Sequence, residues 1–251
     1  PASSTEATYG LKVGNKSIVT DENLETTVSF DIELSKDDSK VLAADGVVYT
    51  INIYIGEGLV ATGVTHNGVA VENYSYNPAT GIITFTTDSF SPFTVSYSEN
   101  VIEINSAEDL IAALTEIKTD AKQQIPGTEG NKNYRVNAIF VLNNDIVIDA
   151  DTEFMYTDSN GAPLHFYGVR GVLDLNGHNI TVSSDALLDG KGHANAVLLF
   201  QYSNVDIIGE GSIIANNKSI PVYAWANCSV NIYGGNYVTN ASERNESAVY
   251  V

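Results

Sequence analysis

Two groups of ionisable side chains in the second half of the chain could do acid–base chemistry. The first is Asp174 with His178, preceded by Arg170. The second shares a glycine-containing stretch and consists of Asp185, Asp189, Lys191 and His193. Clustered carboxylates beside a base are the groups that cleave glycosidic bonds. A structural interpretation stays open for both groups, because Asp174 also suits a polar turn and the other four residues suit a solvated loop. We therefore assign no catalytic residue.

A second candidate is a cation site at Asp149 and Asp151, close to Asp145. Together with loop carbonyls, these carboxylates offer the oxygen ligands that Ca²⁺ prefers. A charged surface turn explains the same residues. We predict no cofactor, and Ca²⁺ is the one cation that such a site would take.

Aromatic residues near the end of the chain suggest a binding surface. If neighbouring strands stack in register, Leu198 lies on Tyr223 and Phe200 lies on Trp225. Tyr250 then follows over Tyr223. The residues between them are small and apolar enough to fill an interior, which turns the aromatic residues outward. We predict a platform for sugar rings or protein made of Phe200, Tyr223, Trp225 and Tyr250. The alternative is that these aromatic residues belong to the core.

The net negative charge of the chain limits the classes of molecule that it can bind. The chain has 31 acidic residues against 12 Lys and Arg, a formal net charge of −19, so it repels nucleic acid and anionic lipid. We expect no nucleic-acid partner. The shortage of bases also argues against a lyase that acts on acidic polysaccharides, whereas a hydrolase of neutral glycans stays open.

The composition indicates an extracellular β-rich chain, with 14 Tyr, 20 Gly and one Met. The single cysteine, Cys228, excludes an intramolecular disulfide. No apolar run approaches the roughly 18 residues of a membrane span. The chain begins at Pro1 without a signal segment, so we expect a processed piece that is secreted or attached to the cell surface and does not insert into a membrane.

Residues 8–99 alternate strands with turns, after a polar leader of residues 1–7. Thr27–Leu34 alternates strictly between polar and apolar residues, and Val47–Ile55 is a second, more buried run. Asn67 and Gly68 predict a hairpin, since both tolerate the positive φ of a type I′ turn. Residues 77–81 predict another. Strands at intervals of about ten residues predict a β-sandwich.

Residues 100–251 contain a short repeat. Four segments alternate apolar residues into an Asn- or Gly-rich turn: Phe140–Ile148, Val172–Val182, Val205–Ile214 and Val230–Val238. Setting Val172 over Val205 and Val205 over Val230 gives coils of about three short strands, which predicts the first coils of a right-handed parallel β-helix. Val249–Val251 begins a further coil, so we expect more coils or a partner chain at that edge.

A short amphipathic helix precedes the repeat, at about 105–118. Ser106 to Asp109 begins like a capping box. One helical face carries Leu110, Ile111, Leu114 and Ile117. We expect this helix to cover the open N-terminal end of the coils, whose apolar surface would otherwise recruit another chain.

Two resemblances to known families follow from these residues. Residues 66–68, 74–76 and 84–95, with the ending Phe-Ser-Pro-Phe-Thr-Val, are similar to the end of immunoglobulin-like modules in large surface proteins of Gram-positive gut bacteria. That resemblance implies a spacer or binding domain without catalytic residues. Residues 101–104, the helix and residues 139–142 resemble the start of β-helix domains of the pectate-lyase-like superfamily. Many relatives there cleave polysaccharides, the lyases with Ca²⁺ and an Arg or Lys base and the hydrolases with paired Asp.

Together these observations predict an all-β protein with a leader at 1–7, an immunoglobulin-like β-sandwich at 8–99, and a capping helix with a right-handed parallel β-helix at 100–251. We expect an extracellular adhesin or scaffold that is not an enzyme and that binds a host or bacterial glycan or surface protein on its β-helix face. One alternative is a carbohydrate-active enzyme of the β-helix superfamily, a polysaccharide lyase or glycoside hydrolase. Another is a subunit that self-associates end to end by strand addition at its open edge.

Overall fold

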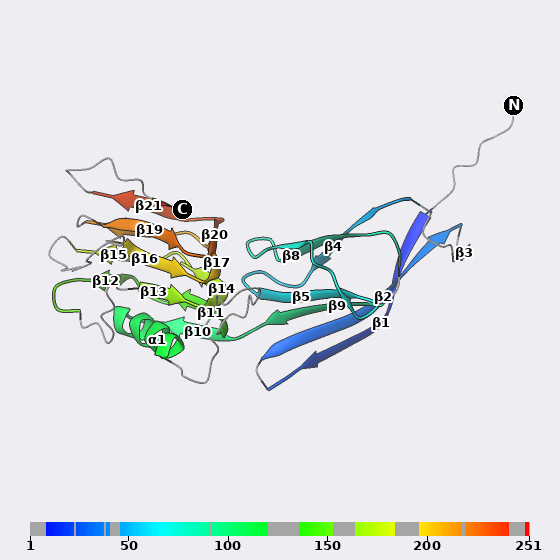
Figure 1. Ribbon diagram of the computed structural model, residues 1–251, viewed down its shortest axis with the longest axis horizontal. Coiled ribbons are helices and arrows are strands. Elements are labelled where there is room, and N and C mark those ends of the chain that lie inside the picture. Colours follow the sequence, from blue (N-terminus) through cyan, green and yellow to red (C-terminus); the bar gives the residue numbers. More distant parts are fainter. Residues whose placement is uncertain are drawn as a thin grey trace, which may run out of the picture. The chain divides into compact units, whose positions relative to one another are not determined.

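The computed structural model describes residues 9–22, 24–37, 39–40, 46–90, 92–119, 136–152, 164–183, 196–216, 219–240 and 249–250. These residues form an all-β protein with one helix. The chain divides into two compact units, Pro1–Asn100 and Val101–Val251. Within the described part, the sheets of the first unit are antiparallel and those of the second are parallel (Figure 1). No helix in these ranges is long and apolar enough to cross a membrane.

The first unit contains two antiparallel sheets. The larger has the order β1-β2-β9-β5-β6, with β3 beside β2. Its strands are β1 (Tyr9–Thr20), β2 (Glu25–Lys36), β3 (Ser39–Lys40), β5 (Val60–His66), β6 (Val69–Ala70) and β9 (Phe93–Ser98). The smaller has the order β4-β8-β7, with β4 (Tyr49–Tyr54), β7 (Tyr74–Asn77) and β8 (Ile82–Thr87). Residues of both sheets share one buried core: Phe30, Ile32, Ile51, Val64, Ile83, Phe85, Phe93 and Val95.

Both predicted hairpins are confirmed. In the first, His66 of β5 pairs with Val69 of β6, and the two residues between them have φ values of 52° and 75°. Asn and Gly occupy those positions because few other residues adopt positive φ without strain. In the second, Asn77 of β7 pairs with Ile82 of β8.

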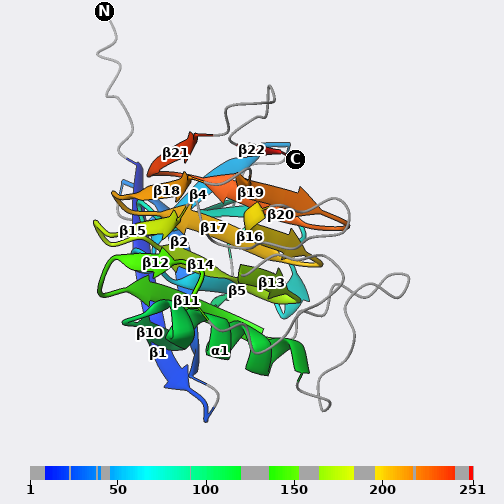
Figure 2. The ribbon, with the colours of Figure 1, turned by 90° about the vertical axis from the view of Figure 1, so that its left-hand side faces the viewer.

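The second unit contains three parallel sheets that the chain visits in turn (Figure 2). The first sheet is β10 (Val101–Ile104), β11 (Val136–Leu142), β14 (Val169–Asp174), β17 (Asn204–Ile208) and β20 (Ser229–Ile232). The second is β12 (Ile146–Ile148), β15 (Asn179–Val182), β18 (Ser212–Ala215) and β21 (Asn236–Thr239). The third is β13 (Leu164–Tyr167), β16 (Ala196–Gln201), β19 (Ile220–Trp225) and β22 (Val249–Tyr250). Each circuit therefore adds one strand to every sheet.

The core of this unit is built from columns of paired apolar residues. The first sheet contributes Phe140, Leu173 and Ile207. The second contributes Ile146, Ile180 and Ile213, and the third contributes Leu164, Leu198 and Val222. All nine side chains are at most 1% exposed. Burial of apolar surface between consecutive circuits holds the stack together.

The predicted helix is confirmed as α1 (Ala107–Thr119). Ser106 Oγ accepts the backbone N–H of Asp109 at 3.2 Å, and a carboxylate oxygen of Asp109 accepts the backbone N–H of Asn105 at 3.0 Å. These bonds satisfy N–H groups that have no partner inside the helix. Leu110 and its apolar neighbours pack into the same core as Ile104. Figure 2 shows α1 at one end of the stack, where it contacts β10, β12 and β13.

The predicted register is wrong between two of the coils. Gly171, and not Val172, pairs with Val205, so Val172 lies opposite Asp206. The next step, Val205 opposite Val230, is confirmed. A Cβ added to Gly171 would sit 2.3 Å from the carbonyl oxygen of Ala138, so the strand requires glycine where it runs closest to the preceding coil.

Connections between the sheets differ in length from corner to corner. From the first sheet to the second they are short: residues 143–145, 175–178, 209–211 and 233–235. From the third sheet to the next first-sheet strand they are one to three residues long: residues 168, 202–203 and 226–228. From the second sheet to the third they vary widely: residues 149–163, 183–195, 216–219 and 240–248. Differences in coil length therefore concentrate at one corner.

Candidate functional site

The outward side of the third sheet carries two rows of side chains. In one row, His165 lies opposite Leu199, which lies opposite Tyr223. In the other, Tyr167 lies opposite Gln201, which lies opposite Trp225. The first row is buried, with Tyr223 only 8% exposed, whereas all three residues of the second are half-buried. Accessible aromatic surface therefore lies along the second row, which we call the Trp225 row.

The predicted platform needs correction at two of its four residues. Phe200 is fully buried and stacks on Phe166, with ring centroids 4.8 Å apart and an interplanar angle of 25°. It lies opposite Ala224 and not Trp225. Tyr223 points outward but is also buried. Burial leaves neither ring free to stack on a sugar.

Trp225 keeps the predicted outward position, but it is half-buried and packs against the cluster of Ala196, Leu199 and Tyr223 instead of being fully exposed. Tyr250 lies opposite Tyr223 in β22, as predicted, but its side chain is outside the described part. The structure thus replaces a ladder of four aromatic residues by the Trp225 row.

A further aromatic residue, Tyr202, adjoins this row. The sequence pattern did not indicate it as a candidate. Its ring packs edge-on against Tyr167, with centroids 5.5 Å apart and an interplanar angle of 81°. Its φ is 51°, whereas the corner of the preceding coil has Gly168 at 72°. A bulky residue with positive φ is uncommon and costs energy. We call Tyr167, Tyr202, Gln201 and Trp225 the aromatic cluster.

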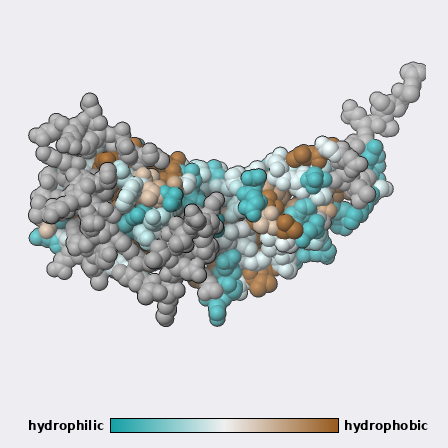
Figure 3. Space-filling model, in the orientation of Figure 1, coloured by the Kyte–Doolittle hydropathy of each residue, from teal (hydrophilic) through white to brown (hydrophobic). Residues whose placement is uncertain are grey.

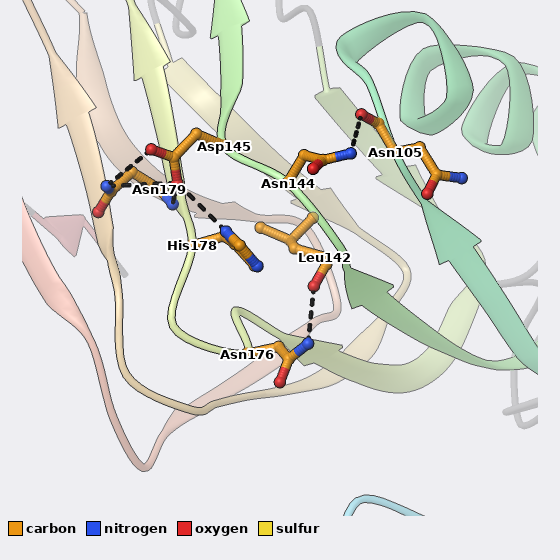
Figure 4. Close-up of polar contacts among 7 residues, drawn as sticks. All are labelled: Asn105, Leu142, Asn144, Asp145, Asn176, His178 and Asn179. Atoms are coloured by element: carbon orange, nitrogen blue, oxygen red, sulfur yellow. Dashed lines mark hydrogen bonds and ion pairs between the residues drawn. The ribbon is translucent and has the colours of Figure 1, made fainter.

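The first predicted acid–base group does not come together. Asp174 accepts the backbone N–H of Asn176 at 2.8 Å, which supports its turn interpretation. His178 instead contacts Asp145, with 3.4 Å between Nδ1 and Oδ1 (Figure 4). Arg170 lies in β14, opposite Asn204 of β17. The second predicted group, Asp185, Asp189, Lys191 and His193, lies outside the described residues.

Polar side chains at the first corner join consecutive coils (Figure 4). Asp145 Oδ1 accepts the backbone N–H of Asn179 at 2.9 Å, and this bond is the main reason why the pKa of Asp145 is lowered. The side-chain amide of Asn176 donates to the Leu142 carbonyl at 2.9 Å. The contacts satisfy backbone groups at the turns, so this cluster has a structural explanation.

The predicted cation site also has a structural explanation. Asp149 Oδ1 accepts the backbone N–H of Asp151 and the Thr152 hydroxyl, each at 3.0 Å. Such bonds are typical of an Asx turn. Among the described residues, no group of three or more His, Cys, Asp or Glu is arranged to hold a metal ion.

One carboxylate that the sequence analysis missed is Asp206 in β17. It accepts a hydrogen bond from the Asn231 amide at 2.8 Å, and burial raises its pKa. Val172 lies opposite Asp206, so Asp174 lies on the same face of the sheet, two residues along the neighbouring strand. An acidic residue between the apolar Val205 and Ile207 was the available signal.

Comparisons with known proteins do not extend this description. No protein-family model matches the sequence, and no curated protein or solved structure matches it at a significant level.

Proposed function

We propose that this protein is an extracellular, non-catalytic adhesin or scaffold that binds glycan through the aromatic cluster. It would belong to the bacterial surface proteins of the Gram-positive type, with an immunoglobulin-like β-sandwich followed by a capped, right-handed parallel β-helix. Two antiparallel sheets that share one core support the first assignment. Three parallel sheets visited in turn, with α1 at one end, support the second.

The observation that carries the proposal is the half-buried Trp225 row, which keeps part of its aromatic surface accessible, with Tyr202 beside it. Indole and phenol rings offer flat apolar faces on which the C–H groups of a sugar ring can stack. Gln201 lies between Tyr167 and Trp225 and brings an amide that can exchange hydrogen bonds with sugar hydroxyls. Regular strands fix the spacing, which reduces the entropy lost on binding. The charge of −19 favours neutral glycans over acidic ones.

A glycan array, run with and without Ca²⁺, tests this proposal. Trp225→Ala should weaken binding about tenfold, as expected if it removes about 1.4 kcal/mol of stacking. Tyr54→Ala is the matched control, because Tyr54 is an exposed aromatic residue in the first unit. Unchanged glycan binding by Trp225→Ala would contradict the proposal. If the protein binds immobilised surface proteins but no glycan, its partner would be a surface protein.

Asp206 favours a second candidate function, a carbohydrate-active enzyme. A carboxyl whose pKa is raised by burial suits a general acid, and Asp174 on the same face of the neighbouring strand would be the second carboxylate of the pair. Prolonged incubation of bound glycans followed by mass analysis tests this candidate. Cleavage that Asp206→Asn abolishes would establish an enzyme, whereas intact glycans would leave the adhesin.

A further inference from the structure

The two sheets of the first unit are unequal, and the larger one extends past the smaller. Among the described strands, β1 pairs only with β2, and β4 pairs only with β8. Val13 and Ile18 of β1 lie opposite Ile32 and Val28 of β2, which belong to the core or pack against it, and Leu11 lies opposite Leu34. Yet these three side chains are 61%, 61% and 57% exposed. The apolar inner side of β1 is therefore not covered by the smaller sheet.

This uncovered side forms one wall of a groove with a volume of about 470 Å³. Figure 3 shows hydrophobic residues at the surface where Figure 1 places β1 and β2. From β2 the groove is lined by every second residue, Val28, Phe30 and Ile32, which is how a strand presents a face. From β4 and the residue after it, the lining is continuous, from Thr50 to Ile55, which is how a strand presents its edge. The groove thus lies between the face of one sheet and the edge of the other.

The free edge of β4 favours an extended peptide strand as its ligand. The backbone N–H and C=O groups along a free strand edge point sideways, and another extended strand satisfies them in a regular ladder. Such a strand would lie about 4.8 Å from β4. In that place its alternate side chains would face Leu11, Val13 and Ile18. The groove therefore fits an extended peptide with apolar residues at every second position.

The charge of the groove indicates which charge a bound peptide should carry. The residues that line the groove include no Asp or Glu. Lys16 lines the groove. A carboxylate on the peptide would meet a positive charge there, whereas a second copy of this chain, with a net charge of −19, would be repelled as a whole.

We propose that the edge of β4 and the apolar side of β1 form a binding site for an extended peptide segment of a partner protein. The peptide adds a fourth strand to the β4-β8-β7 sheet. Its alternate apolar side chains cover Leu11, Val13 and Ile18, and an acidic residue lies near Lys16. This site belongs to the first unit and does not depend on glycan binding by the second.

The probe is a synthetic peptide that begins with glutamate and then alternates valine with threonine over seven residues. Calorimetric titration into the full chain should show binding, and hydrogen exchange should show new amide protection within Thr50–Ile55. A peptide of the same sequence with every backbone amide methylated keeps the side chains but cannot form the ladder. It should bind at least tenfold more weakly. Equal binding of both peptides, or no binding at millimolar concentration, would overturn the proposal.

Two matched variants locate the site. Val13→Asp places a charge in the groove, and its fold should persist because the side chain is already 61% exposed. Val69→Asp is the control, since Val69 is 70% exposed and does not line the groove. The peptide should lose at least tenfold affinity for Val13→Asp and none for Val69→Asp. Equal affinities would refute the site, and a dimer of the full chain that Val13→Asp dissociates would identify a second copy as the occupant.

Discussion

Phe166 and Phe200 stack inside the second unit, one coil apart, with ring centroids 4.8 Å from each other. Both are fully buried. Phe200→Ala should therefore lower the free energy of unfolding by about 3–5 kcal/mol, through lost burial and the cavity left behind. Urea denaturation measures this change. Trp225→Ala, on the outward side, should destabilise less, and the reverse order would contradict the assignment of these two residues to core and surface.

Backbone strain at Tyr202 predicts a difference between two small replacements. Tyr202→Ala and Tyr202→Gly both remove the ring that packs against Tyr167. Only glycine also relieves the positive φ of 51°. The glycine variant should therefore be more stable than the alanine variant by about 1–2 kcal/mol. Thermal unfolding of both proteins tests the prediction, which fails if alanine is the more stable.

The N-terminal cap of α1 gives a third prediction. Ser106→Ala removes the acceptor for the backbone N–H of Asp109 and should destabilise the second unit by about 1 kcal/mol. Ser106→Thr keeps a hydroxyl in place and should lose little. Denaturation midpoints of the two variants should separate, and equal midpoints would show that the cap contributes nothing.

Asp206 predicts a pH dependence of stability. Because burial raises its folded-state pKa, the folded protein holds the proton more tightly than the unfolded chain does. Its contribution is therefore most favourable below the unfolded pKa of about 3.9 and is lost as pH rises through the folded value. Asp206→Asn, which keeps an acceptor for Asn231, should raise stability at pH 7 and lose this advantage near pH 3. A variant that is less stable than wild type at pH 7 would contradict the sign.

Asp145 predicts the opposite pH dependence. The backbone N–H of Asn179 favours the ionised carboxylate and lowers its folded-state pKa. The stabilisation is present above the unfolded pKa of about 3.9 and disappears as pH falls through the folded value. Asp145→Asn should reduce stability at pH 7 and make no difference at pH 2. Unfolding curves at the two pH values measure this, and a constant difference would rule out ionisation as the cause.

Local patterns predicted local structure well. The hairpin at Asn67 and the cap at Ser106 depend on backbone geometry within a few residues, so the residue types at these positions were sufficient. The position of Phe200 depends instead on which side of β16 faces inward. Ala196 to Phe200 are all fully buried, so hydrophobicity does not alternate there and cannot choose between the two sides.

Contacts between coils were harder to predict because they join residues far apart in the sequence. His178 contacts Asp145, and Asn231 bonds to Asp206. Each pair depends on the register of neighbouring coils, and a shift of one residue at Gly171 changes which side chains meet. The sequence showed carboxylates and amides near turns but not their partners. Tyr202 was missed for another reason, since its significance lies in a backbone angle that tyrosine seldom adopts.

The varying connections between the second and third sheets have an evolutionary consequence. Strand pairing fixes the residues on either side of this corner, while the number of residues that bridge it differs from coil to coil. Insertions and deletions there leave the hydrogen-bonded ladders unchanged, so this corner can diversify faster than the rest of the chain.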